Sequence, residues 1–320
     1  MENNITNSVS VPIPPKEGLG ESRYYKFTPL RKQMIWGSEI WQISGVPGSE
    51  TTYEGMNINE LVQQEQARLV GEANYQRFGN EFPLLIKFID AKADLSIQVH
   101  PNDEVARRQG KDKGKTEMWY VLDSAPGACL YNGLKKQITP DEYKELVANK
   151  TICDALAKYT VSEGDCFFIP AGRVHSILSG CYLVEIQQTS DTTYRIYDFD
   201  RRDKDGNPRQ LHVKEAAESI DYRVLDDYQT HYTPVKNKSQ LLVSCPHFDT
   251  AVYDLDEPML IDYSELDSFV VLIGLKGSAT LTIGDEDVTL QGGESILLPA
   301  TTEKVHVNGQ LKFLETYVLS

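Results

Sequence analysis

The chain has 320 residues, about twice the size of a typical domain, which allows one large or two modest domains. Apolar residues make up 40% and charged residues 25% of the sequence, proportions that exclude a collagen, a coiled coil or a largely disordered chain. The 47 acidic and 32 basic residues give a formal net charge of −15, which repels a phosphate backbone, so nucleic acid is not an expected partner.

Several features indicate a cytoplasmic protein that does not contact a membrane. No apolar run approaches the roughly 20 residues of a membrane-spanning helix. The N-terminal residues have neither the basic region nor the apolar region of a signal peptide. The five cysteines are odd in number, scattered and without a C-x-x-C pair, so we expect reduced thiols rather than disulfides or a thiolate zinc site.

The first segment, residues 1–22, is polar and rich in proline and glycine, and we predict a flexible arm there. After it, short runs of β-branched and aromatic residues alternate with turn residues at intervals of roughly 8–12 residues, which is typical of a β sandwich or barrel. Examples of the strands that this pattern predicts are 40–44, 95–100, 118–122, 165–169, 182–187, 269–273, 279–283, 295–298 and 311–318.

Two stretches have the apolar spacing of helices. The first is 57–77, and the second is 140–159, as one helix or two short ones. Thr139 is a plausible N-cap for the second stretch, because Pro140 and Glu142 then take the positions they favour in a first turn. We therefore expect a β architecture with a few accessory helices.

An eight-residue pattern occurs twice: glycine, an acid, a small residue, three apolar residues, proline and alanine, at 164–171 and at 293–300. The strands around it recur as well, so we predict two related β barrels. A natural boundary between them is the polar stretch 228–244.

Polar side chains that could carry chemistry share the faces of two predicted strands. Alternation along a strand places Ser96, Gln98 and His100 on one face. The next strand places Lys115 and Glu117 together in the same way. Both strands could point these groups into one barrel interior.

A second histidine, His175, follows the predicted strand 165–169 after a proline turn. A barrel interior can bring donors from different strands together, and Gln98, His100, Glu117 and His175 form a set that suits Zn²⁺ or another divalent metal. Because glutamine is a weak donor, Gln98 either binds the metal directly or acts through a water molecule.

Four blocks of sequence resemble, in order, the signature blocks of type I phosphomannose isomerases, which are zinc-dependent cupin enzymes that interconvert mannose 6-phosphate and fructose 6-phosphate. The blocks are SIQVHPND (96–103), GKTEMWY (114–120), FIPAGRVH (168–175) and YRIYD (194–198). The resemblance covers about residues 35–222 and takes in 82–88. It implies a mainly β fold of two cupin-like jelly-roll barrels with accessory helices, in the short bacterial form.

The resemblance also implies site residues. The metal ligands of the family fall on Gln98, His100, Glu117 and His175, and its catalytic arginine falls on Arg195. The implied cofactor is one Zn²⁺ per chain, and the implied partner is a small phosphosugar. Whether the chain is a monomer or a homodimer stays open.

The chain departs from the family pattern at two places. The stretch between Trp36 and Trp41 is shorter than expected. The second barrel has Lys304 where the first has the histidine of the repeat, so we expect no metal site there. The predicted domains are the arm, a catalytic metal-binding cupin domain at 23–240 with helical segments, and a cupin-like domain at 241–320.

An aldose–ketose isomerisation needs a base at carbon, stabilisation of the enediolate oxygens and a grip on the phosphate. Arg195 is always charged, so its role should be electrostatic. Lys115 and Glu185 are equal candidates for the base. Ser96, Lys115 and Arg201 are the candidate substrate contacts, because Ser96 faces the same way as the ligands and the other two could hold the phosphate.

Two other functions compete with the isomerase. Two histidines and a carboxylate can bind Fe(II) and activate O₂, as in cupin oxygenases. A sugar-binding cupin without catalysis is the second alternative. The amide donor, the nearby arginine and the four blocks favour the isomerase over both.

Overall fold

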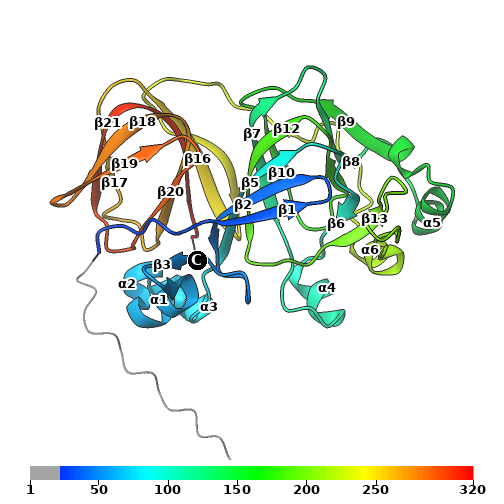
Figure 1. The fold of residues 1–320 in the computed structure, drawn as a ribbon, viewed down its shortest axis with the longest axis horizontal. Coiled ribbons are helices and arrows are strands. Elements are labelled where there is room, and N and C mark those ends of the chain that lie inside the picture. Colours follow the sequence, from blue (N-terminus) through cyan, green and yellow to red (C-terminus); the bar gives the residue numbers. More distant parts are fainter. Residues whose placement is uncertain (1–21, 320) are drawn as a thin grey trace, which may run out of the picture.

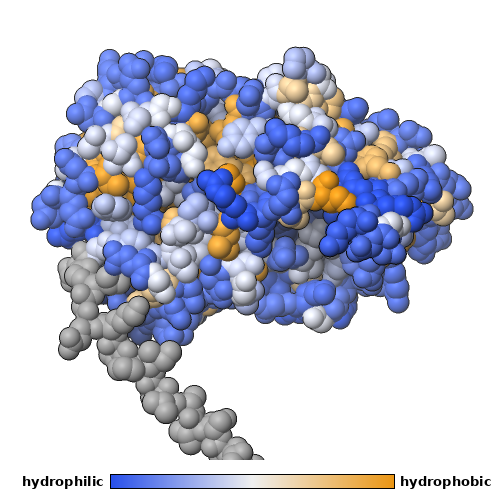
Figure 2. All heavy atoms as spheres, viewed as in Figure 1, coloured by the Kyte–Doolittle hydropathy of each residue, from blue (hydrophilic) through white to orange (hydrophobic). Residues whose placement is uncertain are grey.

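Two bodies of antiparallel β strands make up residues 22–319, the part of the chain that the computed structural model describes (Figure 1). The predicted arm, residues 1–22, lies outside this part except for its last residue. The prediction of a mainly β fold with a few accessory helices is confirmed. The surface in Figure 2 is largely hydrophilic, with apolar patches separated by polar residues, as the composition indicates.

The first β body consists of two sheets that enclose an apolar core. The seven-stranded sheet has the order β1 (Leu30–Met34), β2 (Gly37–Ser44), β5 (Leu84–Ala91), β12 (Cys181–Gln188), β7 (Glu117–Ser124), β10 (Cys166–Ile169) and β14 (Gln229–Thr230). The five-stranded sheet has the order β13 (Tyr194–Tyr197), β6 (Ile97–Val99), β11 (His175–Ile177), β8 (Cys129–Leu134) and β9 (Leu156–Thr160). Trp119 and Phe167 of the first sheet pack with Leu130 and Ile177 of the second.

The second β body is one sheet folded around its own core. Its strands are β15 (Gln240–Cys245), β16 (Phe248–Leu255), β17 (Met259–Asp262), β18 (Val270–Ile283), β19 (Glu286–Gln291), β20 (Ser295–Leu298) and β21 (Lys304–Tyr317). The predicted strands 269–273 and 279–283 are a single strand, β18, with a register shift between Gly274 and Lys276. Glycine permits such a bulge, so the turn residues seen in the sequence bend the strand without ending it.

The two bodies pack through the outer face of the seven-stranded sheet (Figure 1). Its central strands β5 and β12 are buried on both faces, which explains their nearly continuous apolar sequences. Phe88 and Val184 point toward the second body and share a cluster with Phe269 and Leu314. The side chains that alternate with Phe88 on β5 and with Val184 on β12 point the other way, into the first body, where the site lies.

The helix predicted at 57–77 is three short helices, α1 (Ile58–Glu65), α2 (Ala67–Val70) and α3 (Glu72–Phe78). Breaks fall at Gln66 and Gly71, which have φ angles of 53° and 92°. The second break allows close approach to the second body, where the Asp267 carboxylate accepts a 2.8 Å bond from the backbone N–H of Glu72. Tertiary contact therefore overrides the helical pattern.

The prediction for 140–159 is correct in its first part. Helix α5 (Pro140–Ala148) begins at Thr139 with the expected capping box, and a 3₁₀ turn, η1 (Ile152–Ala155), follows. The remaining residues form β9 and were wrongly predicted as helix. They form a strand because β8 offers an edge for pairing, and every second side chain is exposed. The helices α4 (Asp103–Arg108) and α6 (Val213–Ser219) were not predicted. Several strands were not predicted either, among them β1, β5, β8, β16 and β19 and the short pair β3 (Thr52–Tyr53) and β4 (Met56–Asn57).

The chain passes from the first body to the second between β14 and β15, within the boundary predicted at 228–244. The segment 23–240 nevertheless contributes to both bodies. Tyr25 pairs with Leu297 of the second body, and α1 to α3 lie against that body (Figure 1). Among residues 22–319, no helix has the length and apolar character needed to cross a membrane.

Candidate metal centre and active site

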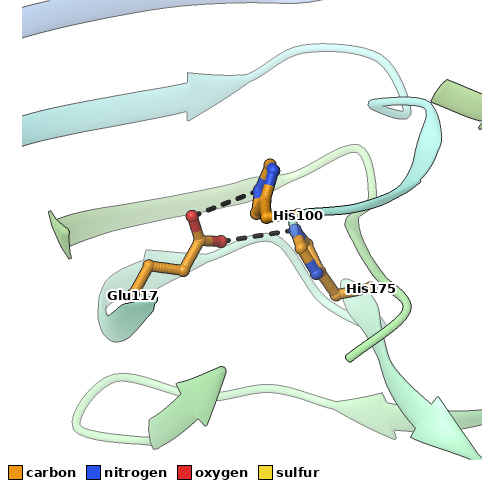
Figure 3. Close-up of side chains that lie close together, drawn as sticks. All are labelled: His100, Glu117 and His175. Atoms are coloured by element: carbon orange, nitrogen blue, oxygen red, sulfur yellow. Dashed lines mark ion pairs between the residues drawn. The ribbon is translucent and has the colours of Figure 1, made fainter. Parts of the chain in front are cut away.

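Two facing sheets bring the predicted metal donors together. On the five-stranded sheet, Gln98 of β6 pairs with His175 of β11 on one side and with Arg195 of β13 on the other. Cross-strand partners share a face, so these three side chains lie in one row. His100 follows directly after β6, and Glu117 begins β7 on the opposite sheet and points toward both histidines (Figure 3).

The two histidines present bare nitrogens to the carboxylate. His100 Nδ1 lies 2.9 Å from the Thr192 carbonyl oxygen, and His175 Nδ1 lies 2.8 Å from the Arg173 carbonyl oxygen. Carbonyls only accept, so each Nδ1 carries the proton and each neutral ring has an unprotonated Nε2. These nitrogens lie 3.4 and 3.3 Å from the two oxygens of Glu117 (Figure 3).

This arrangement fits a divalent cation. Among the described residues, His100 Nε2 and Glu117 Oε1 are buried with no hydrogen-bond partner, while Glu117 Oε2 lies 3.0 Å from Lys115 Nζ. The donor atoms of the three residues lie within 4.8 Å of one another. Lone pairs that face each other with no proton between them repel, and a cation removes that repulsion. Two imidazoles and a carboxylate are a donor set that Zn²⁺ favours, and ligand histidines commonly donate their other N–H to a carbonyl.

The electrostatics keep all three donors in their ligating forms. Burial lowers the pKa of His100 to about 4, with Lys115 acting in the same direction, and burial also lowers the pKa of His175. Burial alone would raise the pKa of Glu117, but Lys115 and the two histidines outweigh it and hold that pKa well below the usual range. At neutral pH the rings are neutral and the carboxylate is ionised.

Gln98 borders this cluster. Its amide nitrogen is placed 3.3 Å from His175 Nε2. If the amide group is turned over, its oxygen faces His175 Nε2 in place of its nitrogen, which is the orientation that a metal ligand needs. Both roles predicted for Gln98, direct ligand and water-linked partner, are compatible with this position.

Lys115 and Glu185, the two candidate bases, lie next to the donors. Lys115 Nζ is 3.0 Å from Glu117 Oε2 and 3.7 Å from Glu185 Oε1. Glu185 also accepts a 2.9 Å hydrogen bond from Trp119 Nε1. Burial and the Glu117 charge raise the pKa of Glu185, but Lys115 and Lys87 outweigh them, so the pKa is lowered.

Lys87 is a site residue that the sequence reasoning missed. It pairs across the sheet with Glu185, and its Nζ lies 2.9 Å from Glu185 Oε1. Burial opposes its charge, but Glu185 and Glu39 raise the pKa of Lys87 overall. A signal was present, because a lysine in the middle of a buried apolar strand needs a buried partner.

A cavity of about 330 Å³ opens beside the donors, a size suited to a small ligand. The structure brings five of the predicted residues to its wall: Ser96, Gln98, Lys115, Glu185 and Arg195. It also brings residues that were not predicted: Lys32, Lys87 and Arg209 with positive charges, and Glu39 and Asp191 with negative ones. The sequence holds no local signal for Arg209, whose place depends on contacts made by the fold.

The arginines near this cavity differ in their surroundings. Arg195 donates from Nη1 to the Gln210 carbonyl oxygen at 2.9 Å, while its buried Nε has no partner. Burial lowers the pKa of Arg195, and the charges of Arg209 and Arg201 act in the same direction. Arg201, predicted to contact substrate, bonds instead to the Asp94 carbonyl oxygen and is not part of the cavity wall.

Comparison with known proteins gives consistent matches along the chain. Residues 25–132 match the family model of the phosphomannose isomerase type I catalytic domain, and residues 237–318 match that of the mannose-6-phosphate isomerase cupin domain. The chain is 30% identical over 297 residues to mannose-6-phosphate isomerase ManA of Bacillus subtilis, covering 85% of this chain and 92% of that protein.

Two further relatives agree. Mannose-6-phosphate isomerase of Streptococcus mutans is 30% identical over 289 residues, which cover 87% of this chain and 88% of that protein. The crystal structure of the mannose 6-phosphate isomerase from Bacillus subtilis matches with a TM-score of 0.83 and 26% identity, over 93% of this chain and 100% of that one. The predicted cupin fold is thereby confirmed.

Proposed function

Because this chain belongs to the type I phosphomannose isomerase family, we propose that it interconverts mannose 6-phosphate and fructose 6-phosphate through an enediol(ate) intermediate. The observation that carries the proposal is the meeting of three buried donors, His100, Glu117 and His175, beside a cavity lined by lysines and arginines. The donors suit a metal that acts on a carbonyl, and the cations suit an anionic sugar.

We propose that one Zn²⁺ per chain binds His100, Glu117 and His175, with Gln98 as a direct or water-linked fourth partner. When bound, such a metal polarises a carbonyl and stabilises negative charge on oxygen. In the second body, the position predicted to match His175 is Lys304, which is exposed and lies 3.7 Å from Asp262. A lysine in a surface ion pair does not bind a metal, which supports a single metal site per chain.

Proton transfer between the sugar carbons is assigned to the Lys115–Glu185 pair. Lys115 Nζ lies 3.0 Å from Glu117 Oε2 and 3.7 Å from Glu185 Oε1, so it stands between the proposed metal donors and Glu185. Glu185 is fixed by Trp119 and Lys87 and therefore has little freedom to turn toward a substrate. This favours Lys115 as the group that meets the sugar and Glu185 as its partner.

Arg195 and Arg209 are the groups we propose for the anionic parts of the substrate. Arg195 has an unpartnered buried Nε and lies in a row with Gln98, next to the metal donors, which suits charge that develops on the enediolate oxygens. Arg209, from the cavity wall, is proposed for the phosphate role that was predicted for Arg201. Ser96 adds a hydroxyl on the same wall.

A coupled assay that follows fructose 6-phosphate formed from mannose 6-phosphate, with and without chelator, tests the function. We expect turnover that chelation abolishes and Zn²⁺ restores. Oxygen consumption with bound iron would favour the oxygenase, and sugar binding without turnover would favour the binding protein; either result would overturn the isomerase.

The setting of the protein is also proposed. All five cysteines are free thiols, which fits the reducing cytoplasm. The expected partner is a small phosphosugar, since the net charge of −15 disfavours nucleic acid. A monomer and a homodimer are both compatible with one complete cavity per chain.

A further inference from the structure

We propose that Asp198 is a positioning residue that aims Arg209 into the cavity, and that Arg201 holds Asp198 in place. The inference rests on the proposed function, because it assigns the phosphate end of that same site. It explains why a buried carboxylate stands in a group of arginines that is otherwise suited to an anion.

Asp198 grips Arg209 with both of its oxygens. Arg209 Nε donates to Asp198 Oδ2 at 2.7 Å, and Nη2 donates to Asp198 Oδ1. The Asp198 side chain is only 5% exposed, so this is not a solvent-screened surface pair. A two-bond fork of this kind fixes both the position and the plane of a guanidinium.

The fork leaves donors for a ligand. A guanidinium has five N–H groups, and Asp198 uses two of them, so Arg209 can still offer the others to the cavity it lines. Arg209 and Arg201 stand close enough to Arg195 for their charges to lower its pKa. Three arginines around one carboxylate keep a net positive charge, which favours an anionic group.

Arg201 is a second arginine beside Asp198. Its backbone N–H donates to the Asp198 carbonyl oxygen at 3.0 Å, and its Nη1 lies 3.9 Å from Asp198 Oδ1. Its Nη2 donates to the Asp94 carbonyl oxygen, which ties it to the loop between β5 and β6. Arg201 therefore stabilises the carboxylate rather than contacting the cavity.

The backbone around Asp198 is strained in a way that favours a functional constraint. Phe199 and Asp200 have φ angles of 55° and 56°, a left-handed conformation that is uncommon for residues other than glycine. Phe199 packs against Tyr197 with ring centroids 5.0 Å apart, and Asp200 pairs with Lys150 at 2.7 Å. These contacts hold the turn that brings the chain back toward Asp198.

The loop beyond this turn is built to return Arg209 to Asp198. Arg202 and Pro208 form an isolated β bridge across it. Inside the loop, the Asp203 carboxylate accepts bonds from the backbone N–H groups of Asp205 and Asn207, at 2.9 and 2.8 Å. A loop closed in this way presents its last side chain at a fixed place.

The test compares Asp198→Asn with Asp200→Asn, a matched control on the same turn whose partner, Lys150, is exposed. Asparagine keeps the shape of Asp198 but loses the charge that holds the fork. We expect the KM for mannose 6-phosphate to rise about tenfold in Asp198→Asn with kcat changed little, because a fixed ion-pair hydrogen bond is lost. Asp200→Asn should leave both constants unchanged.

A double-mutant cycle separates positioning from a general structural role. In an Arg209→Gln background, Asp198→Asn should cause no further rise in KM, whereas an additive rise would overturn the proposal. Arg209→Lys, which keeps the charge but cannot form the two-bond fork, should match Asp198→Asn and decides the question if Asp198→Asn does not fold.

Binding of inorganic phosphate, measured by calorimetry, distinguishes this proposal from the proposed function. Wild-type protein that binds phosphate but does not turn over mannose 6-phosphate would refute the isomerase alone, and the Asp198→Asn variant would then still be expected to bind phosphate about tenfold more weakly. Equal phosphate affinity in Asp198→Asn and wild-type protein would refute the positioning role.

Discussion

Glu185 and Glu315 occupy equivalent positions in the two β bodies. Each glutamate pairs across its sheet with a residue of the neighbouring strand. That residue pairs in turn with the fourth residue of the repeated eight-residue segment, which is Phe167 in the first body and Ile296 in the second. The repeat seen in the sequence therefore extends to a buried carboxyl group inside each body. In the first body this carboxyl group, Glu185, lines the cavity.

The neighbours of the two carboxyl groups differ. Glu185 pairs with Lys87, whereas Glu315 pairs with Ala251 at the matching place. Glu315 accepts instead from the hydroxyl of Tyr263 at 2.5 Å. With no cation to offset it, burial raises the pKa of Glu315, while cations lower that of Glu185. The first body holds a carboxylate paired with lysines, and the second holds a carboxyl group bonded to a tyrosine hydroxyl.

A Glu315→Gln substitution should reduce the loss of stability at high pH. A carboxyl whose pKa is raised on folding binds its proton more tightly when folded, so its stabilising effect is lost as pH rises through the folded pKa. We expect the difference in Tm between about pH 5 and about pH 8 to be smaller in Glu315→Gln than in wild-type protein. Isomerase activity should be retained.

Exposed Glu303 provides the control, because Glu303→Gln removes the same charge from the surface of the same body. A pH dependence of Tm that is identical in wild-type protein and in both variants would show that Glu315 does not titrate on unfolding.

The buried histidines give the opposite pH dependence in metal-free protein. The pKa of His100 is about 4 in the fold against 6.5 in the unfolded chain, so between these values the unfolded chain binds the extra proton. Acid should lower the free energy of unfolding by roughly 3 kcal/mol across this window, measured by denaturant titration after chelation.

His100→Gln should flatten that dependence, while His306→Gln, at an exposed position on β21, should leave it unchanged. Bound metal should also protect against acid, since protons and metal compete for the same nitrogens. Equal slopes in wild-type protein and His100→Gln would contradict the neutral, buried state of this ring.

His175→Ala and Glu117→Gln should lose metal and turnover together while the fold persists. Each removes a donor whose lone pair faces the other donors, so the loss should exceed the roughly 10–100-fold that follows removal of an outer partner. Elemental analysis and the coupled assay measure the two effects, and circular dichroism checks the fold. Normal metal content in either variant would exclude that residue as a ligand.

The meeting of His100, Glu117 and His175 was predictable because the signal for each residue is local. Strand alternation and short motifs place His100 and Glu117, and the proline turn after a strand places His175. Lys87 and Arg209 were not predicted, since their partners, Glu185 and Asp198, are brought to them by sheet register and by loop closure. These contacts are decided by the fold and leave little trace in neighbouring residues.

The same difference between local signals and distant contacts applies to the prediction of the fold. The strands predicted from apolar runs match elements of the structure because such runs report directly on burial, but other strands, such as β1, β8 and β19, were not predicted. The breaks within 57–77 and the strand at 156–160 depended on the second body and on β8, respectively, neither of which a local window contains. The joining of two predicted strands into β18 depended on glycines that could equally have formed a turn.

Lys87→Met should destabilise the protein by roughly 3–5 kcal/mol, because it leaves the buried Glu185 carboxylate without its nearest cation. The double variant Lys87→Met/Glu185→Gln should recover much of this loss, since no buried charge is then left unpaired. Lys92→Met is the matched control, because Lys92 is 75% exposed and its pair with Asp90 should contribute less than about 1 kcal/mol. Equal Tm values for the Lys87 and Lys92 variants would contradict a buried ion pair.

Arg195→Lys should fold and bind metal normally but lose about 10²–10³ in kcat. Arg195 uses Nη1 to hold the Gln210 carbonyl and keeps a buried, unpartnered Nε, so it can be anchored and still donate to an oxyanion. A lysine has a single nitrogen and cannot present the planar fork of donors that two neighbouring enediolate oxygens require. An interaction made only in the transition state leaves KM nearly unchanged. Arg202→Lys is the control: the Arg202 side chain donates to the Gly206 carbonyl oxygen of its own loop, so this variant should keep normal kcat and KM. A raised KM with near-normal kcat would instead move Arg195 to the phosphate, beside Arg209.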